Sequence, residues 1–176
     1  MTTDSFAASQ ELGFKTLKPE GPCISVGLGT CGIGSGAEEL LYELIRQAPE
    51  GLLVKKAGCF GFCAKEPLLM LYLPDKPILL FSEVKVKDIK KIVAAAMNPK
   101  QAERLAKTAM AKISRWDFRT TELVFGEGWP DVPEWNGLAF FKNQEKLVLR
   151  DCGLIDPEKI EEYMARWDEA DFQKKL

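Results

Sequence analysis

The stretch that decides the fold is residues 24–32, with the sequence ISVGLGTCG. Its apolar start predicts a short strand, and the glycines after it predict a tight loop. Apolar residues then recur at helical spacing from Ala37 to Ala48, which predicts one face of a helix. A second strand is predicted at residues 52–54, and it leads to residues 59–63, CFGFC. The sequence therefore predicts a βαβ unit whose two strands each end in a loop that carries cysteine.

Downstream of this unit, the pattern predicts a hairpin and a helix. Residues 68–73 and 78–81 are apolar runs too short for a typical helix, and they flank a turn with the sequence PDKP. Helical spacing returns between Val86 and Met97. The predicted order over residues 22–97 is β-α-β-β-β-α, which is the element order of a small thioredoxin-like α/β domain.

Three segments are predicted along the chain. Residues 1–98 form the thioredoxin-like domain, and residues 99–115 form a connector with a helix over 101–114. Residues 116–176 form a small α+β segment, with a hairpin of residues 138–141 and 147–149. Asp156 as N-cap and Pro157 at the first helical position predict a final helix that runs towards Arg166.

Composition excludes several classes of function. The chain has no histidine, which excludes Cys/His zinc sites, Rieske-type clusters and Ser-His or Cys-His catalysis. Its net charge of −2 provides no basic surface for nucleic acid. It has no apolar run of about 20 residues and no hydrophobic secretory signal, so we expect a cytoplasmic protein without membrane insertion. Five cysteines are an odd number for a disulfide framework and favour free thiols.

Three of these thiols lie on the two loops of the βαβ unit: Cys31, Cys59 and Cys63. Cysteines on two loops that each follow a strand, one beside the other, suggest an iron–sulfur site. One alternative is that the cysteines are half-buried small hydrophobes. Another is a redox dithiol, although such pairs usually have the spacing Cys-x-x-Cys at a helix N-terminus.

The glycines at 27, 29 and 32 match the pattern G-x-G-x-x-G, which predicts dinucleotide binding through backbone N–H groups at a helix N-terminus. A ribose-binding acidic residue is expected about 20 positions later, but Lys55 and Lys56 stand there. The glycines also suit a tight loop, and their N–H groups could donate to cluster sulfur. The glycines alone do not separate these alternatives.

Several motifs resemble a known family. Residues 29–31 (GTC), 35–37 (SGA), 56–63 (KAGCFGFC) and 66–68 (EPL) resemble the thioredoxin-like [2Fe–2S] ferredoxin domain of NADH dehydrogenases and NAD-linked hydrogenases. Residues 147–158, LVLRDCGLIDPE, resemble the N-terminal segment of the flavoprotein subunit, ahead of its flavin fold.

The resemblance implies a [2Fe–2S] centre held by Cys31, Cys59 and Cys63, with backbone N–H groups near Gly29 and Gly61 setting its potential. It implies an electron-transfer subunit that performs no substrate turnover and has no FMN or NAD site in this chain. The implied partners are a flavoprotein subunit that carries FMN and the NADH site, and other iron–sulfur subunits.

The chain departs from the family at the first loop, where the family has two cysteines separated by four residues and this chain has Gly27 and Gly32. Cys23 lies about 13 Å from the loop on an extended strand, at about 3.3 Å per residue, and Cys152 is expected to pack at a turn. A complete site then needs Ser25, Ser35 or a partner's thiol.

The missing ligands leave a second hypothesis open, a cluster-less adaptor that docks a flavoprotein. The tryptophans at 129 and 135 have two interpretations. They are anchors for such a partner, or they fill a small second core.

Overall fold

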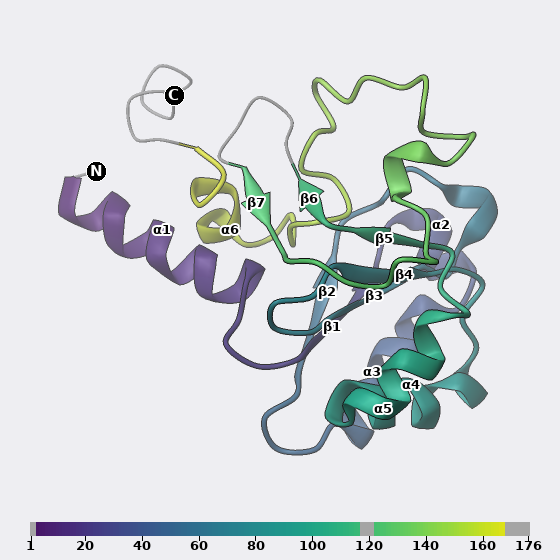
Figure 1. Cartoon of the computed structure of the whole chain (residues 1–176). Coiled ribbons are helices and arrows are strands. Elements are labelled where there is room, and N and C mark those ends of the chain that lie inside the picture. Colours follow the sequence, from purple (N-terminus) through teal and green to yellow (C-terminus); the bar gives the residue numbers. More distant parts are fainter. Residues whose placement is uncertain (1–2, 117–121, 168–176) are drawn as a thin grey trace.

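The computed structural model describes residues 3–116 and 122–167, and it centres on one five-stranded sheet (Figure 1). The strand order is β2-β1-β3-β4-β5. β1 and β2 are parallel, and the other neighbours are antiparallel. The strands are β1 (Cys23–Gly27), β2 (Leu53–Ala57), β3 (Leu69–Tyr72), β4 (Ile78–Phe81) and β5 (Ala111–Ile113).

The parallel pair requires a crossover connection, and two helices supply it. α2 (Thr30–Gly34) follows the glycine-rich loop, and α3 (Ala37–Gln47) returns the chain to the start of β2. The other elements are α1 (Thr3–Leu17), η1 (Cys63–Lys65), η2 (Val86–Asp88), α4 (Ile89–Met97), α5 (Pro99–Ala106), β6 (Arg115–Trp116), β7 (Leu123–Val124), η3 (Trp135–Gly137) and α6 (Ile160–Met164).

The order β1-α3-β2-β3-β4-α4 confirms the predicted α/β class with a thioredoxin-like arrangement of its elements. The predicted hairpin is present, because β3 and β4 pair in antiparallel register from Leu69 opposite Phe81 to Leu71 opposite Leu79.

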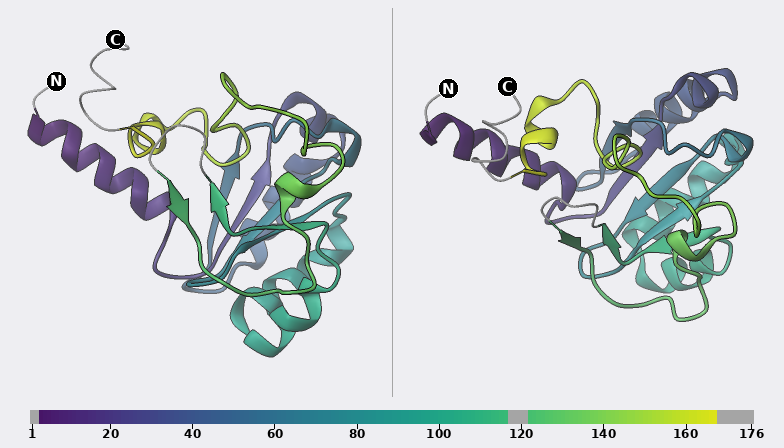
Figure 2. Two further views of the ribbon diagram at one scale, coloured as in Figure 1. Left: turned by 45° about the horizontal axis from the view of Figure 1, so that its top comes forward. Right: turned by 90° about the horizontal axis from the view of Figure 1, so that it is seen from above.

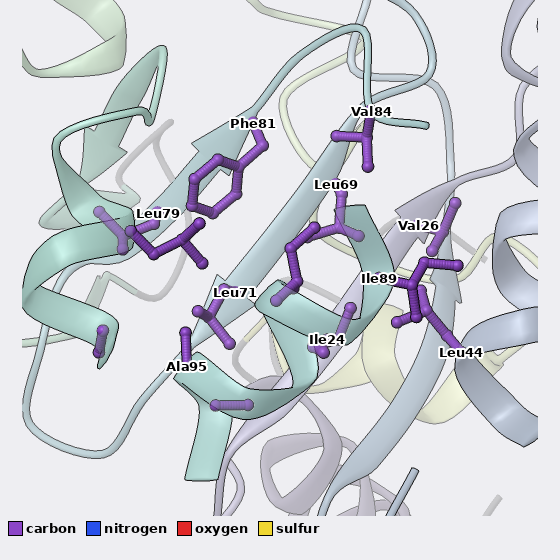
Figure 3. Packing of buried hydrophobic residues seen from close by; sticks show 14 of the residues in the cluster. Ile24, Val26, Leu44, Leu69, Leu71, Leu79, Phe81, Val84, Ile89 and Ala95 are labelled. Atoms are coloured by element: carbon purple, nitrogen blue, oxygen red, sulfur yellow. The ribbon is translucent and has the colours of Figure 1, made fainter. Parts of the chain in front are cut away.

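Both faces of the sheet are covered, which explains why β1, β3 and β4 are buried at every position. α3, α4 and α5 cover one face, and the chain after β5 covers the other (Figures 1 and 2). Successive strand residues point to opposite faces. Ile24, Leu71 and Leu79 therefore pack under the helices (Figure 3), while Met70 and Leu80 face the C-terminal segment.

The second core is rich in aromatic residues. Trp129 is 5% exposed within the helical core, and Trp135 is 4% exposed on the opposite face. The interpretation that they fill the second core is thus confirmed for Trp135, whereas Trp129 is buried in the first core, under the helices. Their use as exposed interface anchors is wrong for this structure, because neither ring is available at the surface.

The N-terminal helix α1 was not predicted, and it packs against α6. Phe6 joins Met164 and Trp167 in a small cluster of buried side chains. At Gly13 the helices are so close that a Cβ would overlap the carbonyl oxygen of Glu161. Contacts from α1 therefore help to hold α6 in place.

Two other predicted elements differ from the structure. The helix predicted over 101–114 ends at Ala106, and Ala111–Ile113 forms β5, with Ile113 opposite Ile78. The hairpin predicted at 138–141 and 147–149 is absent, since these residues form turns. Phe141 packs in the second core, whereas Val148 is 93% exposed, so the segment lacks the alternating burial of a strand.

The last helix begins later than predicted. α6 starts at Ile160 with Lys159 at the N-cap. Asp156 instead closes a turn, in which its Oδ1 accepts a hydrogen bond of 3.0 Å from the Glu158 N–H. The Asp156 N–H donates to Glu162 Oε2 at 2.8 Å. In the described part of the chain, no helix is both long and apolar enough to cross a bilayer.

Candidate metal centre

The two cysteine loops meet at one end of the sheet. β1 and β2 are parallel, with Gly27 opposite Ala57, so the loops that follow them leave the sheet at the same end. Cys31 follows in α2, Cys59 lies two residues beyond β2, and Cys63 begins η1. The structure thus brings together the three predicted thiols, which come from segments about thirty residues apart.

Gly29 is the point of closest approach between the loops. A Cβ at this position would lie 2.7 Å from Cys59 Cβ and 3.3 Å from Cys59 Sγ. The Leu28 N–H donates to the Ala57 carbonyl at 2.9 Å, which fixes the two loops side by side. The absence of a side chain at Gly29 therefore allows Cys59 to sit against the first loop.

Cys63 connects the three thiols. The neighbouring Cys31 and its negative charge raise the pKa of the Cys63 thiol, burial raises it further, and interactions with Cys59 and with the backbone oppose the change. All three cysteines are free. Cys31 and Cys63 are exposed, and Cys59 is partly buried, so the group lies at the molecular surface.

Gly61 supplies a hydrogen bond to sulfur. Its N–H donates to Cys59 Sγ at 3.3 Å, and its φ of +88° lies in the left-handed region that favours glycine. A backbone donor at a thiolate stabilises the charged form of that sulfur. The predicted role of Gly61 stays a prediction, and this contact is the geometry on which it depends.

The two loops supply three of the four protein ligands that a [2Fe–2S] cluster takes. Within residues 3–116 and 122–167, no three His, Cys, Asp or Glu side chains are grouped so that they could hold one metal ion. A two-iron cluster requires only two protein ligands on each iron. Three thiols across two adjacent loops supply soft ligands for three of these four positions. The ligand type therefore suits such a cluster, and the fourth ligand is missing from the two loops.

The other two cysteines, Cys23 and Cys152, lie outside the two loops that carry the three thiols. Cys23 begins β1 at the end remote from the loops and is 4% exposed. Burial raises the pKa of its thiol to about 11. Cys152 lies in a turn and is partly buried. Burial also raises the pKa of Cys152, and the Lys146 charge opposes that change.

A buried carboxylate, Glu66, lies beside the glycine-rich loop, and the sequence analysis quoted it in the motif at residues 66–68 without assigning it a role. It is 7% exposed, its Oε2 accepts a hydrogen bond of 2.8 Å from the Leu68 N–H, and its Oε1 has no partner in the structure. A Cβ at Gly32 would lie 3.2 Å from Oε2. Burial raises the pKa of Glu66, and the Leu68 hydrogen bond opposes this. The motif at residues 66–68, three residues after Cys63, was the signal in the sequence that pointed to it.

The C-terminal segment forms one wall of the site, and sequence reasoning also missed this contact. The Gly58 N–H donates to the Ile155 carbonyl at 2.8 Å. A Cβ at Gly153 would lie 2.9 Å from Phe60 Cα, so this turn packs directly on the residue after Cys59. The backbone of the C-terminal segment therefore contacts the backbone of the second cysteine loop.

The glycines of the G-x-G-x-x-G pattern also have close neighbours inside the chain. Gly29 meets Cys59, and a Cβ at Gly32 would overlap the Gly27 carbonyl. Lys55 pairs with Glu162 at 3.1 Å. These contacts support the structural interpretation of the glycines over the dinucleotide hypothesis.

Comparison with known proteins gives a partial likeness. No family model and no curated protein matches the sequence. Among solved structures, a thioredoxin-like [2Fe–2S] ferredoxin from Aquifex aeolicus is similar to this chain at 19% sequence identity and a TM-score of 0.42. The likeness covers 53% of this chain and 93% of the ferredoxin.

Proposed function

We propose that this chain transfers single electrons through a [2Fe–2S] cluster held by Cys31, Cys59 and Cys63. The observation that carries the proposal is the meeting of three free thiols on two adjacent loops, which leave parallel strands side by side and approach each other at Gly29 and Cys59. When bound, the cluster would supply one-electron redox chemistry. The loops hold the sulfurs, and the Gly61 N–H stabilises negative charge on Cys59.

The proposed setting is an NAD(H)-linked flavin and iron–sulfur oxidoreductase, with a flavoprotein subunit and other iron–sulfur subunits as partners. Exposed apolar side chains near the site support a protein partner. Phe62, within the second cysteine loop, stacks on Phe140 with ring centroids 4.2 Å apart. Phe140 is 43% exposed, and Leu147 and Val148 on the same segment are also exposed. Exposed apolar groups of this kind are common where proteins bind one another.

The test is the iron and acid-labile sulfide content of protein purified and reconstituted without air, together with absorption and EPR spectra. We expect two irons and two sulfides per chain in the wild type, in agreement with the [2Fe–2S] type, and loss of both in Cys59→Ser and Cys63→Ser. Cys23→Ala is the matched control, because Cys23 is buried away from the loops. An iron-free wild type that remains folded contradicts the proposal.

A second candidate function is a cluster-less adaptor, favoured by the lack of a fourth cysteine on the two loops. For this function, the fold and the exposed apolar segment bind a flavoprotein and the thiols are dispensable. A complex that assembles and turns over normally with the double variant Cys59→Ser, Cys63→Ser would establish the adaptor and end the electron-transfer proposal.

A further inference from the structure

Lys146 is held inside a group of aromatic rings beside the second cysteine loop. Its Nζ lies 4.7 Å from the ring centroid of Phe60, 5.1 Å from that of Trp135 and 5.3 Å from that of Phe141. The Trp116 ring follows at 5.8 Å. The ammonium also donates a hydrogen bond of 3.0 Å to the Phe60 carbonyl. These contacts hold the Lys146 ammonium at the residue that follows Cys59, although the two residues are far apart in the sequence.

The position is unusual because Lys146 has no carboxylate to neutralise it. By contrast, two lysines of β2 have acidic partners, since Lys55 pairs with Glu162 and Lys56 pairs with Glu158. Within the described ranges, Lys146 forms no ion pair. Its charge is therefore available to act on the thiols.

Burial among the rings and the nearby thiols shift the pKa of Lys146 in opposite directions. Burial lowers the pKa of Lys146, and negative charge on Cys152 and on Cys59 raises it. The same interaction acts on the sulfur in return, because a charge that stabilises its neighbour is stabilised by it to the same extent. Surrounding aromatic groups exclude water and strengthen such interactions relative to bulk solvent.

We propose that Lys146 raises the electron affinity of the thiol site. The inference rests on the proposed function, because it concerns a cluster bound at Cys31, Cys59 and Cys63. Reduction of a cluster bound there would add one electron and one negative charge to the site, without making or breaking a bond in the protein. The fixed ammonium stabilises that added charge, since net charge is one of the factors that set the potential of an iron–sulfur centre.

The experiment is an anaerobic titration of the reconstituted full chain with dithionite as the electron donor, followed by EPR. Lys146→Met removes the charge and keeps an unbranched apolar side chain in the aromatic group. Lys142→Met is the control, because Lys142 is exposed on the same segment and its loss changes the net charge equally. Lys146→Arg keeps the charge.

We expect the midpoint potential of Lys146→Met to move to more negative values than that of Lys142→Met, and Lys146→Arg to stay near the wild type. Should Lys146→Met fail to fold, Lys146→Gln provides the same comparison, because its amide can still donate to the Phe60 carbonyl. Equal potentials in the Lys146 and Lys142 variants would overturn the inference and leave the proposed function standing. A wild type that binds no cluster would overturn both.

Discussion

The five cysteines differ in exposure, and this difference predicts their order of chemical modification. Cys31 and Cys63 are exposed, whereas Cys23 is 4% exposed and burial raises the pKa of its thiol to about 11. In reduced, metal-free protein, we expect iodoacetamide to modify Cys31 and Cys63 first and Cys23 last, because the thiolate is the nucleophile and must be accessible. Peptide mass spectrometry over time measures the order. Modification of Cys23 at the rate of Cys63 would contradict the structure.

Gly29 predicts a local steric effect. Gly29→Ala places a methyl group 2.7 Å from Cys59 Cβ, so the two loops must move apart. We expect a loss of stability of about 1–3 kcal/mol, as for other overpacked sites, together with weaker retention of iron. Gly34→Ala is the matched control because nothing lies within 4 Å of a Cβ at that position. Equal melting temperatures and iron contents in the two variants would show that the contact is not tight.

Glu66 predicts a pH-dependent effect. Burial raises its pKa in the folded state, so the folded protein binds the proton more tightly than the unfolded chain does. The charged carboxylate therefore costs stability, increasingly as the pH rises from the unfolded value of about 4.3 through the raised folded value. We expect Glu66→Gln to be more stable than the wild type near neutral pH.

The advantage of Glu66→Gln should shrink as the pH falls below the unfolded value, because both states of the wild type are then neutral. Urea unfolding at acidic and neutral pH measures it. Glu83→Gln, on an exposed side chain that pairs with Lys65, is the control and should show no such advantage. A Glu66→Gln advantage that is independent of pH would mean that the charge of Glu66 is not its cause.

Sequence reasoning identified part of the site at this scale. Cys59, Cys63 and Gly61 lie within five residues, so their proximity follows from local sequence. The position of Lys146 and the burial of Glu66 could not be found in this way. Lys146 reaches the loop only through tertiary packing of a segment 86 residues away from its hydrogen-bond partner Phe60. Glu66 acquires its unusual environment from burial, which no short motif encodes.

The secondary-structure elements show the same division between local and distant effects. The βαβ unit and the β3–β4 hairpin were predicted because periodicity and turn residues are local properties. Ala111–Ile113 was assigned to a helix on composition, but pairing with β4 makes it a strand. Tertiary pairing can override intrinsic propensity in short segments. The late start of α6 follows from Asp156, which closes a turn before the helix begins.

The contact between α1 and α6 predicts an effect opposite to helix propensity. Alanine favours a helix interior over glycine by about 1 kcal/mol, so Gly13→Ala should stabilise α1 taken alone. Because the added methyl group overlaps the Glu161 carbonyl and approaches Ala165 Cβ, we expect a net loss of about 1–3 kcal/mol. Urea unfolding measures the loss.

The control for Gly13→Ala is Glu11→Ala, at an exposed position of the same helix that pairs only with Lys15. We expect its stability to change far less than that of Gly13→Ala, because an exposed ion pair contributes little in water. A Gly13→Ala variant that is more stable than the wild type would mean that α1 does not pack closely on α6.

In the whole molecule, the C-terminal segment and the sheet share one core. The second core combines Met70 and Leu80 of the sheet with Trp135, Phe141 and Leu154 from the chain beyond β5. One buried ion pair extends this connection, and a second lies within the C-terminal segment itself. Lys55 in β2 pairs with Glu162 in α6 at 3.1 Å. Arg166 Nε donates to Asp151 Oδ1 at 2.8 Å.

The predicted domain boundaries at residues 98 and 115 remain a prediction, and the shared core suggests how to test them. We expect the full chain to unfold in one cooperative transition, since the two parts bury each other's apolar surface. A chain cut after residue 115 should aggregate or bind a hydrophobic dye, because one face of its sheet loses its cover. Calorimetry and dye fluorescence measure these effects. Two separate transitions would instead establish independent domains.

The thioredoxin-like order was predictable because each of its elements carries its own pattern. The cover over the second face was not predictable, because residues 138–155 contain turns without helical or alternating periodicity. Their position depends on single contacts, such as the hydrogen bond from Trp116 Nε1 to the Arg150 carbonyl at 2.8 Å.

The contact of Gly153 with Phe60 has a consequence for biosynthesis. The ribosome makes Cys59 and Phe60 long before it makes the turn that packs on them, because translation proceeds from the N-terminus. During that interval the cysteine loop emerges without its wall, and the aromatic rings near Phe60 have no lysine between them. For the proposed function, iron and sulfide bound by these thiols would therefore be retained best after the C-terminal segment has folded.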